Sequence, residues 1–138
     1  MDNLSNKWKV EYETGIPEID SQHKQLFTHI ETLSLAIYSN SAKKELVTLI
    51  NFLRNYISWH FSTEESLMMQ AHYPDIHKHT EIHRSFEKFF QKIESELSQK
   101  GADKYLAIEV ENKMHDWWVN HILQIDMKYV PFMKDHNK

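Results

Sequence analysis

Four stretches of the chain carry apolar side chains at the spacing of an α-helix. In each stretch most of these positions stand three or four residues apart, which places them on one face of a helix. The four faces are, in chain order, His23, Leu26, Phe27, Ile30 and Leu33; Leu46, Ile50, Leu53, Ile57, His60 and Glu64; His79, His83, Phe86, Phe90, Ile93 and Leu97; and Val110, Met114, Trp117, His121 and Ile125. Four amphipathic helices with short connections predict an all-α fold, an up-down-up-down antiparallel four-helix bundle.

Turn-forming and helix-breaking residues indicate where these helices begin and end. The first helix is expected to follow Pro17, with Asp20 or Ser21 as its N-cap. The second is expected to begin after the polar stretch Ser39-Asn40-Ser41. The expected ends of the second, third and fourth helices are Tyr73-Pro74-Asp75, Gly101 and Pro131.

The chain is expected to form a single domain. Residues 20–130 make up the helical bundle, residues 1–19 an N-terminal arm and residues 131–138 a C-terminal tail. The expected apolar anchors of the arm are Trp8, Tyr12 and Ile16.

Composition narrows the class of protein further. Hydrophobic residues are 41% and charged residues 26% of the chain, as in a soluble globular protein, and two glycines with three prolines are too few for the turns of a β fold. The net charge of −4 argues against a nucleic-acid partner, and the absence of cysteine excludes disulfides and thiolate-ligated metals. Without a signal-peptide pattern at the start or a long apolar run, we expect a cytoplasmic protein with no membrane span.

Histidine is the residue type whose number calls for an explanation, with ten copies in the chain. In an antiparallel bundle, the starts of the odd-numbered helices and the ends of the even-numbered ones lie at the same end. Seven ionisable residues fall at such positions: His23, His60, Glu64, His79, His83, His121 and Asp126. They are therefore expected to lie at a similar depth inside one end of the bundle.

This grouping favours a metal centre over a purely structural role. A single histidine on an apolar face is usually a core residue with one satisfied hydrogen bond. Burying five imidazoles with carboxylates and no compensating cation costs several kcal/mol per charge. A metal ion removes that cost, because imidazole nitrogens and carboxylate oxygens become its ligands.

Two other metal motifs do not fit this sequence. The zinc-protease motif needs glutamate directly after its first histidine, but Thr80 follows His79. Carboxylate-rich ferritin-like centres need Glu-x-x-His pairs, and the chain contains no such pair.

Short motifs occur in a recognisable order along nearly the whole chain. They are Gly15-Ile16-Pro17 before Asp20-Ser21-Gln22-His23-Lys24; His60-Phe61-Ser62-Thr63-Glu64-Glu65; Tyr73-Pro74; His79 and His83 with Phe86; and Trp117 through His121-Ile122, followed by Asp126. In these motifs the chain resembles the hemerythrin family, and in particular its bacterial single-domain members.

The resemblance implies a centre of two iron ions joined by an oxo or hydroxo bridge. By this likeness one iron takes His79, His83 and His121, the other takes His23 and His60, and Glu64 and Asp126 bridge the two. Asp126 follows His121 by five residues, which is off the same face of a regular α-helix. A π-bulge or local unwinding is therefore expected in that turn.

The implied ligand count leaves one coordination position open, on the iron held by His23 and His60. We therefore expect reversible dioxygen binding, for oxygen storage or delivery. Neutral imidazole ligands, and no protein acid or base beside the open position, favour binding over turnover, so the chain is not expected to be an enzyme. The alternatives are an oxygen or redox sensor that acts through a partner, and a di-iron oxidase or an enzyme that scavenges nitric oxide or peroxide.

Three apolar residues are expected to line the oxygen pocket: Phe27, Trp118 and Ile122. Trp118 stands three residues before His121, where members of the family commonly carry leucine. Its larger ring is expected to change oxygen entry and the autoxidation rate, but not the metal site.

Overall fold

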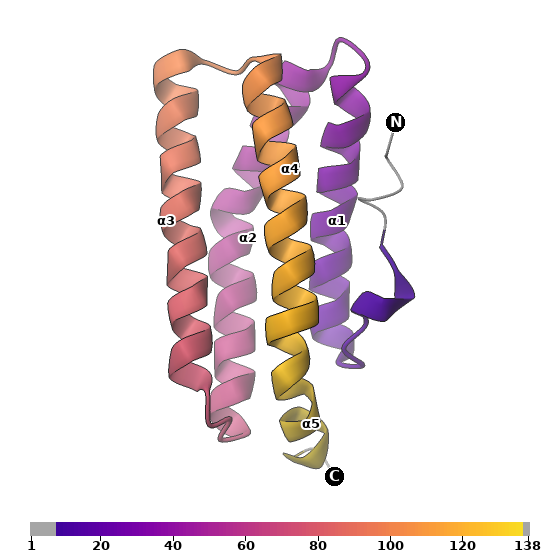
Figure 1. Ribbon diagram of the computed structural model, residues 1–138, viewed down its shortest axis with the longest axis vertical. Coiled ribbons are helices and arrows are strands. Elements are labelled where there is room, and N and C mark those ends of the chain that lie inside the picture. Colours follow the sequence, from indigo (N-terminus) through magenta and orange to yellow (C-terminus); the bar gives the residue numbers. More distant parts are fainter. Residues whose placement is uncertain (1–7, 137–138) are drawn as a thin grey trace.

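The computed structural model describes residues 8–136 of the chain. Its elements are η2 (Val10–Tyr12), α1 (Pro17–Ile37), α2 (Ala42–Gln70), α3 (Ile76–Lys100), α4 (Lys104–Asn120), the π-helical segment η3 (His121–Asp126) and α5 (Met127–His136). The four long helices stand side by side and alternate in direction, with the arm against α1 (Figure 1). The predicted all-α, antiparallel four-helix bundle is confirmed.

The first helix begins earlier than predicted. Its first residue is Pro17 and its N-cap is Ile16, so the prediction of Asp20 or Ser21 as the cap is wrong. Proline suits this position, because its fixed φ matches the helix and the first turn needs no N–H donor. The Asp20 carboxylate instead accepts hydrogen bonds from Thr14, and so ties the arm to α1.

The connections between helices agree with the turn signals in the sequence. α2 begins directly after Ser41 and ends at Gln70, three residues before the Tyr73-Pro74 turn. Gly101 ends α3 with φ of 77°, a left-handed conformation that glycine adopts without steric strain.

Pro131 does not end the last helix. α5 includes Pro131 and continues to His136, so the prediction of a stop and a separate tail at Pro131 is wrong. A proline inside a helix removes one backbone hydrogen bond and crowds the preceding turn. Packing outweighs this loss, since α5 contributes three of the five residues in a buried cluster that closes this end of the bundle: Met68, Tyr73, Tyr129, Val130 and Met133.

The arm packs against α1 (Figure 1). Tyr12 is buried and stacks on Phe27 with 5.3 Å between ring centroids, while Trp8 packs edge-on against both rings. These contacts confirm Trp8 and Tyr12 as anchors. Residues 1–7 of the predicted arm and residues 137–138 of the predicted tail lie outside the described residues.

Candidate metal centre

Seven side chains from α1, α2, α3 and η3 converge inside one end of the bundle. α1 contributes His23, α2 contributes His60 and Glu64, α3 contributes His79 and His83, and η3 contributes His121 and Asp126. Each of the seven is at most 2% exposed. The structure therefore brings together all seven residues singled out in the sequence, and they are called the centre below.

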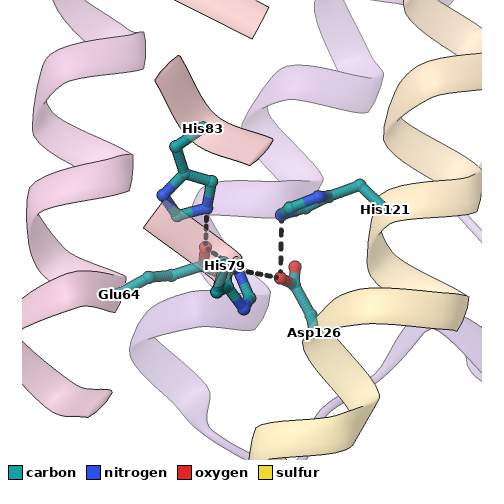
Figure 2. A group of neighbouring side chains, drawn as sticks. All are labelled: Glu64, His79, His83, His121 and Asp126. Atoms are coloured by element: carbon teal, nitrogen blue, oxygen red, sulfur yellow. Dashed lines mark ion pairs between the residues drawn. The ribbon is translucent and has the colours of Figure 1, made fainter. Parts of the chain in front are cut away.

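Three histidines face one oxygen of each carboxylate. Nε2 of His83 lies 3.0 Å from Oε1 of Glu64. Nε2 of His121 and Nε2 of His79 lie 3.0 Å and 3.1 Å from Oδ1 of Asp126 (Figure 2). These three rings, His79, His83 and His121, form the three-histidine group.

The two remaining histidines face the other oxygen of each carboxylate. Nε2 of His23 and Nε2 of His60 are 3.1 Å apart and form the two-histidine group. His60 lies 3.6 Å from Oε2 of Glu64, and His23 lies 3.4 Å from Oδ2 of Asp126. Each carboxylate thus presents one oxygen to each group of histidines, an arrangement that suits two neighbouring cations.

The π-helical turn brings Asp126 into the centre. A regular α-helix turns about 100° per residue, so a residue five positions after His121 would point away from it. Residues His121 to Asp126 form a π-helix, whose wider turn brings positions five apart onto the same face. The local unwinding expected from the sequence is confirmed.

Several buried polar atoms of the centre have no hydrogen-bond partner among the described residues. They include Nε2 of His79, His83 and His121, Oε1 of Glu64, and both carboxylate oxygens of Asp126. Buried polar atoms are normally paired, whereas nitrogens and oxygens of this kind are the usual ligands of transition metals. Both sets, Glu64 with Asp126 and the three-histidine group, and Glu64 with the two-histidine group, keep their ligand atoms within 4.8 Å of one another. The residues therefore fit a pair of metal ions.

The electrostatics of the centre also favour a cation. Burial lowers the pKa of His60 to about 3, so its ring is neutral at pH 7. Burial also acts to lower the pKa of His79, but Asp126 and Glu64 outweigh it and raise this pKa to about 9. Burial acts to raise the pKa of Glu64, yet the neighbouring histidines hold it well below its ordinary value. Without a metal, the proton on His79 supplies positive charge between two carboxylates.

Three residues that support the centre were not singled out in the sequence. Oε1 of Gln22 lies 2.5 Å from Nδ1 of His60, and Oε2 of Glu65 lies 2.7 Å from Nδ1 of His83. The Tyr129 hydroxyl donates a hydrogen bond of 2.8 Å to Oε2 of Glu64. Gln22 precedes His23 and Glu65 follows Glu64, so both lie within the motifs given above, but those motifs alone assign them no role.

The three predicted pocket residues are all buried in the main hydrophobic core. Trp118 contacts both halves of the centre, with its ring centroid 5.6 Å from that of His60 and 6.2 Å from that of His121. Phe27 lies under the arm against Tyr12, and Ile122 is fully buried in the same core. The indole nitrogen of Trp118 is buried without a hydrogen-bond partner among the described residues.

A four-helix bundle that buries five histidines and two carboxylates at one end belongs to the class of helical proteins able to hold metal ions between their helices. The family model of the hemerythrin HHE cation binding domain matches residues 14–133 of the chain. The chain belongs to the hemerythrin family.

Relatives from several organisms agree with this assignment. A bacteriohemerythrin of Clostridium acetobutylicum is 31% identical over 127 residues, which cover 89% of this chain and 97% of the relative. A bacteriohemerythrin of Campylobacter jejuni is 32% identical over 121 residues, covering 87% and 89% of the two chains. A myohemerythrin of Theromyzon tessulatum is 28% identical, with 89% of each chain covered.

Solved structures agree as well. A crystal structure of hemerythrin, of a mutant in which a leucine is replaced by alanine, superposes with a TM-score of 0.73 at 25% identity. The match covers 92% of this chain and 95% of that one. Within residues 8–136, no helix combines the length and the apolar character needed to cross a membrane.

Proposed function

We propose that the centre holds two iron ions and that the protein binds dioxygen reversibly, for oxygen storage or delivery. One observation carries the proposal: Glu64 and Asp126 each turn one oxygen to the three-histidine group and the other to the two-histidine group. Such carboxylates can bridge two metals. Membership of the hemerythrin family supports iron as the metal and dioxygen as the ligand.

The seven side chains supply unequal numbers of donors to the two positions. Three imidazole nitrogens and two carboxylate oxygens are available on one side, but two nitrogens and two oxygens on the other. Iron bound there would supply the electrons and the free coordination position that reversible dioxygen binding needs. On this proposal the free position belongs to the two-histidine side.

The surroundings of the two-histidine group favour binding over turnover. The rings of Trp118 and Tyr56 pack against His60, and both residues are at most 3% exposed. Burial raises the pKa of Tyr56 well above its ordinary value, and its hydroxyl donates a hydrogen bond to the backbone oxygen of Gln22. Tyr56 therefore keeps its proton in a hydrogen bond to the backbone and does not serve as an acid or base for a reaction. Apolar walls formed by Trp118, Ile122 and Phe27 would keep water away from the bound gas.

An optical experiment tests the proposal. The metal-free chain is loaded anaerobically with Fe²⁺, exposed to air and then degassed, while its absorption spectrum is followed. We expect two irons per chain and a charge-transfer band that appears in air and disappears on degassing. A band that bleaches irreversibly, or steady turnover with nitric oxide or peroxide, would favour an enzyme, and a chain that takes up no iron would rule out the proposal.

Glu64→Ala tests the bridging role. The variant removes one oxygen donor from each position, so we expect its iron content to fall well below two per chain and the air-dependent band to be lost. Glu94→Ala, which removes a carboxylate that pairs with Arg54 away from the centre, is the matched control and should keep both irons. If Glu64→Ala also keeps two irons and the wild-type spectrum, Glu64 is not a bridge.

A further inference from the structure

Two histidines of the centre have their outer ring nitrogen held by unlike partners. His83 Nδ1 lies 2.7 Å from the carboxylate of Glu65, in the three-histidine group. His60 Nδ1 lies 2.5 Å from the side-chain oxygen of Gln22, in the two-histidine group. Since both partner atoms are acceptors, each Nδ1 carries a proton and each Nε2 faces the centre.

Glu65 is a charged acceptor that is itself held in place. Its Oε2 also pairs with Arg84, whose other nitrogen lies 3.2 Å from Glu87. A hydrogen bond to a carboxylate is stronger than one to a neutral group and increases the electron density of the imidazole. Nε2 of His83 is therefore a stronger donor to a metal than an unsupported ring.

Gln22 is a neutral acceptor of fixed orientation. Its side-chain nitrogen lies 3.4 Å from the Thr63 hydroxyl, and its backbone oxygen accepts a hydrogen bond of 2.6 Å from Tyr56. These contacts keep the amide oxygen turned to His60. Because the amide has no net charge, it orients this ring but increases its donor strength less than a carboxylate would.

The two oxygens of Glu64 also differ in their expected donor strength, and the difference again favours the three-histidine side. Oε2, on the two-histidine side, accepts a hydrogen bond from Tyr129, whereas Oε1, on the three-histidine side, has no hydrogen-bond partner among the described residues. A carboxylate oxygen that already accepts a hydrogen bond donates less electron density to a metal. The charged contact of Glu65 to His83 is stronger than the neutral contact of Gln22 to His60, and the Tyr129 hydrogen bond weakens Oε2 of Glu64 as a donor, so all three contacts leave the three-histidine position the tighter one.

We propose that Glu65 and Gln22 are positioning residues that set unequal affinities at the two metal positions. The first metal binds at the three-histidine group, supported by Glu65, and the second binds more weakly at the two-histidine group, supported by Gln22. The inference rests on the proposed function, since it requires that the centre binds two metals.

Titration of the metal-free chain with Zn²⁺, in competition with a chelator, tests the order of binding. We expect two separate steps in the wild type. Glu65→Gln keeps the shape of the side chain but removes its charge, and should weaken the first step about tenfold with little change in the second. Gln22→Met removes the acceptor at similar length, and should weaken the second step about tenfold with little change in the first. Glu94→Gln, far from the centre, should leave both steps unchanged.

A proton resonance separates positioning from a general structural effect. In the zinc-loaded, ¹⁵N-histidine-labelled wild type, the Nδ1 proton of His83 should appear strongly downfield, because a carboxylate accepts it. It should move upfield in Glu65→Gln and stay in place in Gln22→Met and Glu94→Gln.

Several outcomes would overturn the inference. They are two equal zinc steps in the wild type, equal weakening of both steps by either variant, and a wild-type His83 Nδ1 proton without a downfield shift. The last measurement needs no variant and so does not depend on the folding of one. Two tight but equal steps would leave the proposed function intact, whereas a wild type that binds no metal would remove the proposed function itself.

Discussion

Trp118 packs beside both halves of the centre. Its ring lies within 6.3 Å, between centroids, of His23, His60 and His121, and none of it is exposed. On the proposed function, a ring of this size would exclude water from the two-histidine group and narrow the path by which a gas reaches it. Trp118 would then affect how oxygen enters and leaves, and not how the metals are held.

Trp118→Leu should increase the rate of autoxidation while leaving two irons per chain. The smaller side chain opens the pocket to water, and the cavity it leaves should lower the free energy of unfolding by roughly 2 kcal/mol. Stopped-flow oxygen kinetics and iron analysis measure the two effects separately. Trp59→Leu, at a half-exposed tryptophan of α2, is the control and should change neither. Unchanged oxygen kinetics in Trp118→Leu would remove this residue from the pocket.

At the level of single residues, the seven members of the centre could be predicted but their supports could not. Helical spacing and the antiparallel arrangement suffice to bring His60 and Glu64 to the depth of His79 and His83. The roles of Gln22 and Glu65 depend instead on which way two neighbouring helices are rotated. Adjacent residues on a helix point about 100° apart, so the neighbour of a ligand has no fixed direction until that rotation is known.

Among the elements, η3 decides whether the last carboxylate reaches the centre. The helix is regular through α4, widens over His121–Asp126 and is regular again in α5. Buried residues precede and follow the wide turn: Met114 and Trp118 on one side, Tyr129 and Met133 on the other. The extra residue is thus accommodated locally, and both ends of the helix stay packed on the bundle.

Exchange of two neighbouring residues tests this role of the π-turn. In Ile125→Asp with Asp126→Ile, the carboxylate lies four residues after His121, which would suit a regular α-helix. Because the turn is a π-helix, we expect the exchanged carboxylate to miss the centre and the chain to bind fewer than two irons. Iron analysis and circular dichroism, the latter to check folding, provide the measurement. Full iron content in the exchanged variant would mean that the wide turn is not what positions the carboxylate.

The ends of the elements show where local signals are insufficient. Proline normally ends a helix, and on that basis Pro131 was expected to end the last one. The helix nevertheless continues, and its side chains on both sides of Pro131 are buried against the bundle, above all Tyr129, whose hydroxyl donates a hydrogen bond to Glu64. Tertiary packing of this kind outweighs local propensity, and no pattern within α5 itself reports it.

For the molecule as a whole, the centre concentrates ionisable groups in the interior of a domain. Glu64 and Asp126 keep pKa values well below the ordinary ones, although burial acts in the opposite direction, because histidines surround them. His79 carries the compensating proton in the absence of metal. The stability of the metal-free protein should therefore depend on pH on both sides of neutrality.

The metal-free chain should be most stable near pH 6.5. The pKa of His79 is raised to about 9, so its contribution is complete below 6.5 and is lost as the pH rises toward 9. The pKa of His60 is lowered to about 3, so the unfolded chain takes up a proton that the folded one does not, and stability falls as the pH drops below 6.5. The depressed carboxylates lose their contribution at still lower pH.

Urea unfolding in the presence of a chelator, measured across this pH range, gives the profile. His79→Gln should flatten its alkaline side and leave the acid side, because it removes the group that loses its proton there. An alkaline slope that survives in His79→Gln would show that another group is responsible.

The wide turn at η3 also has a consequence for the engineering of metal sites. Designed bundles are usually built from ideal α-helices, in which two ligands on one helix must stand three or four residues apart. His121 and Asp126 show that a single inserted residue makes a third spacing available, with the helix resuming its path on both sides. A designer who allows one such insertion gains a histidine–carboxylate pair that no straight helix can supply, without rebuilding the rest of the scaffold.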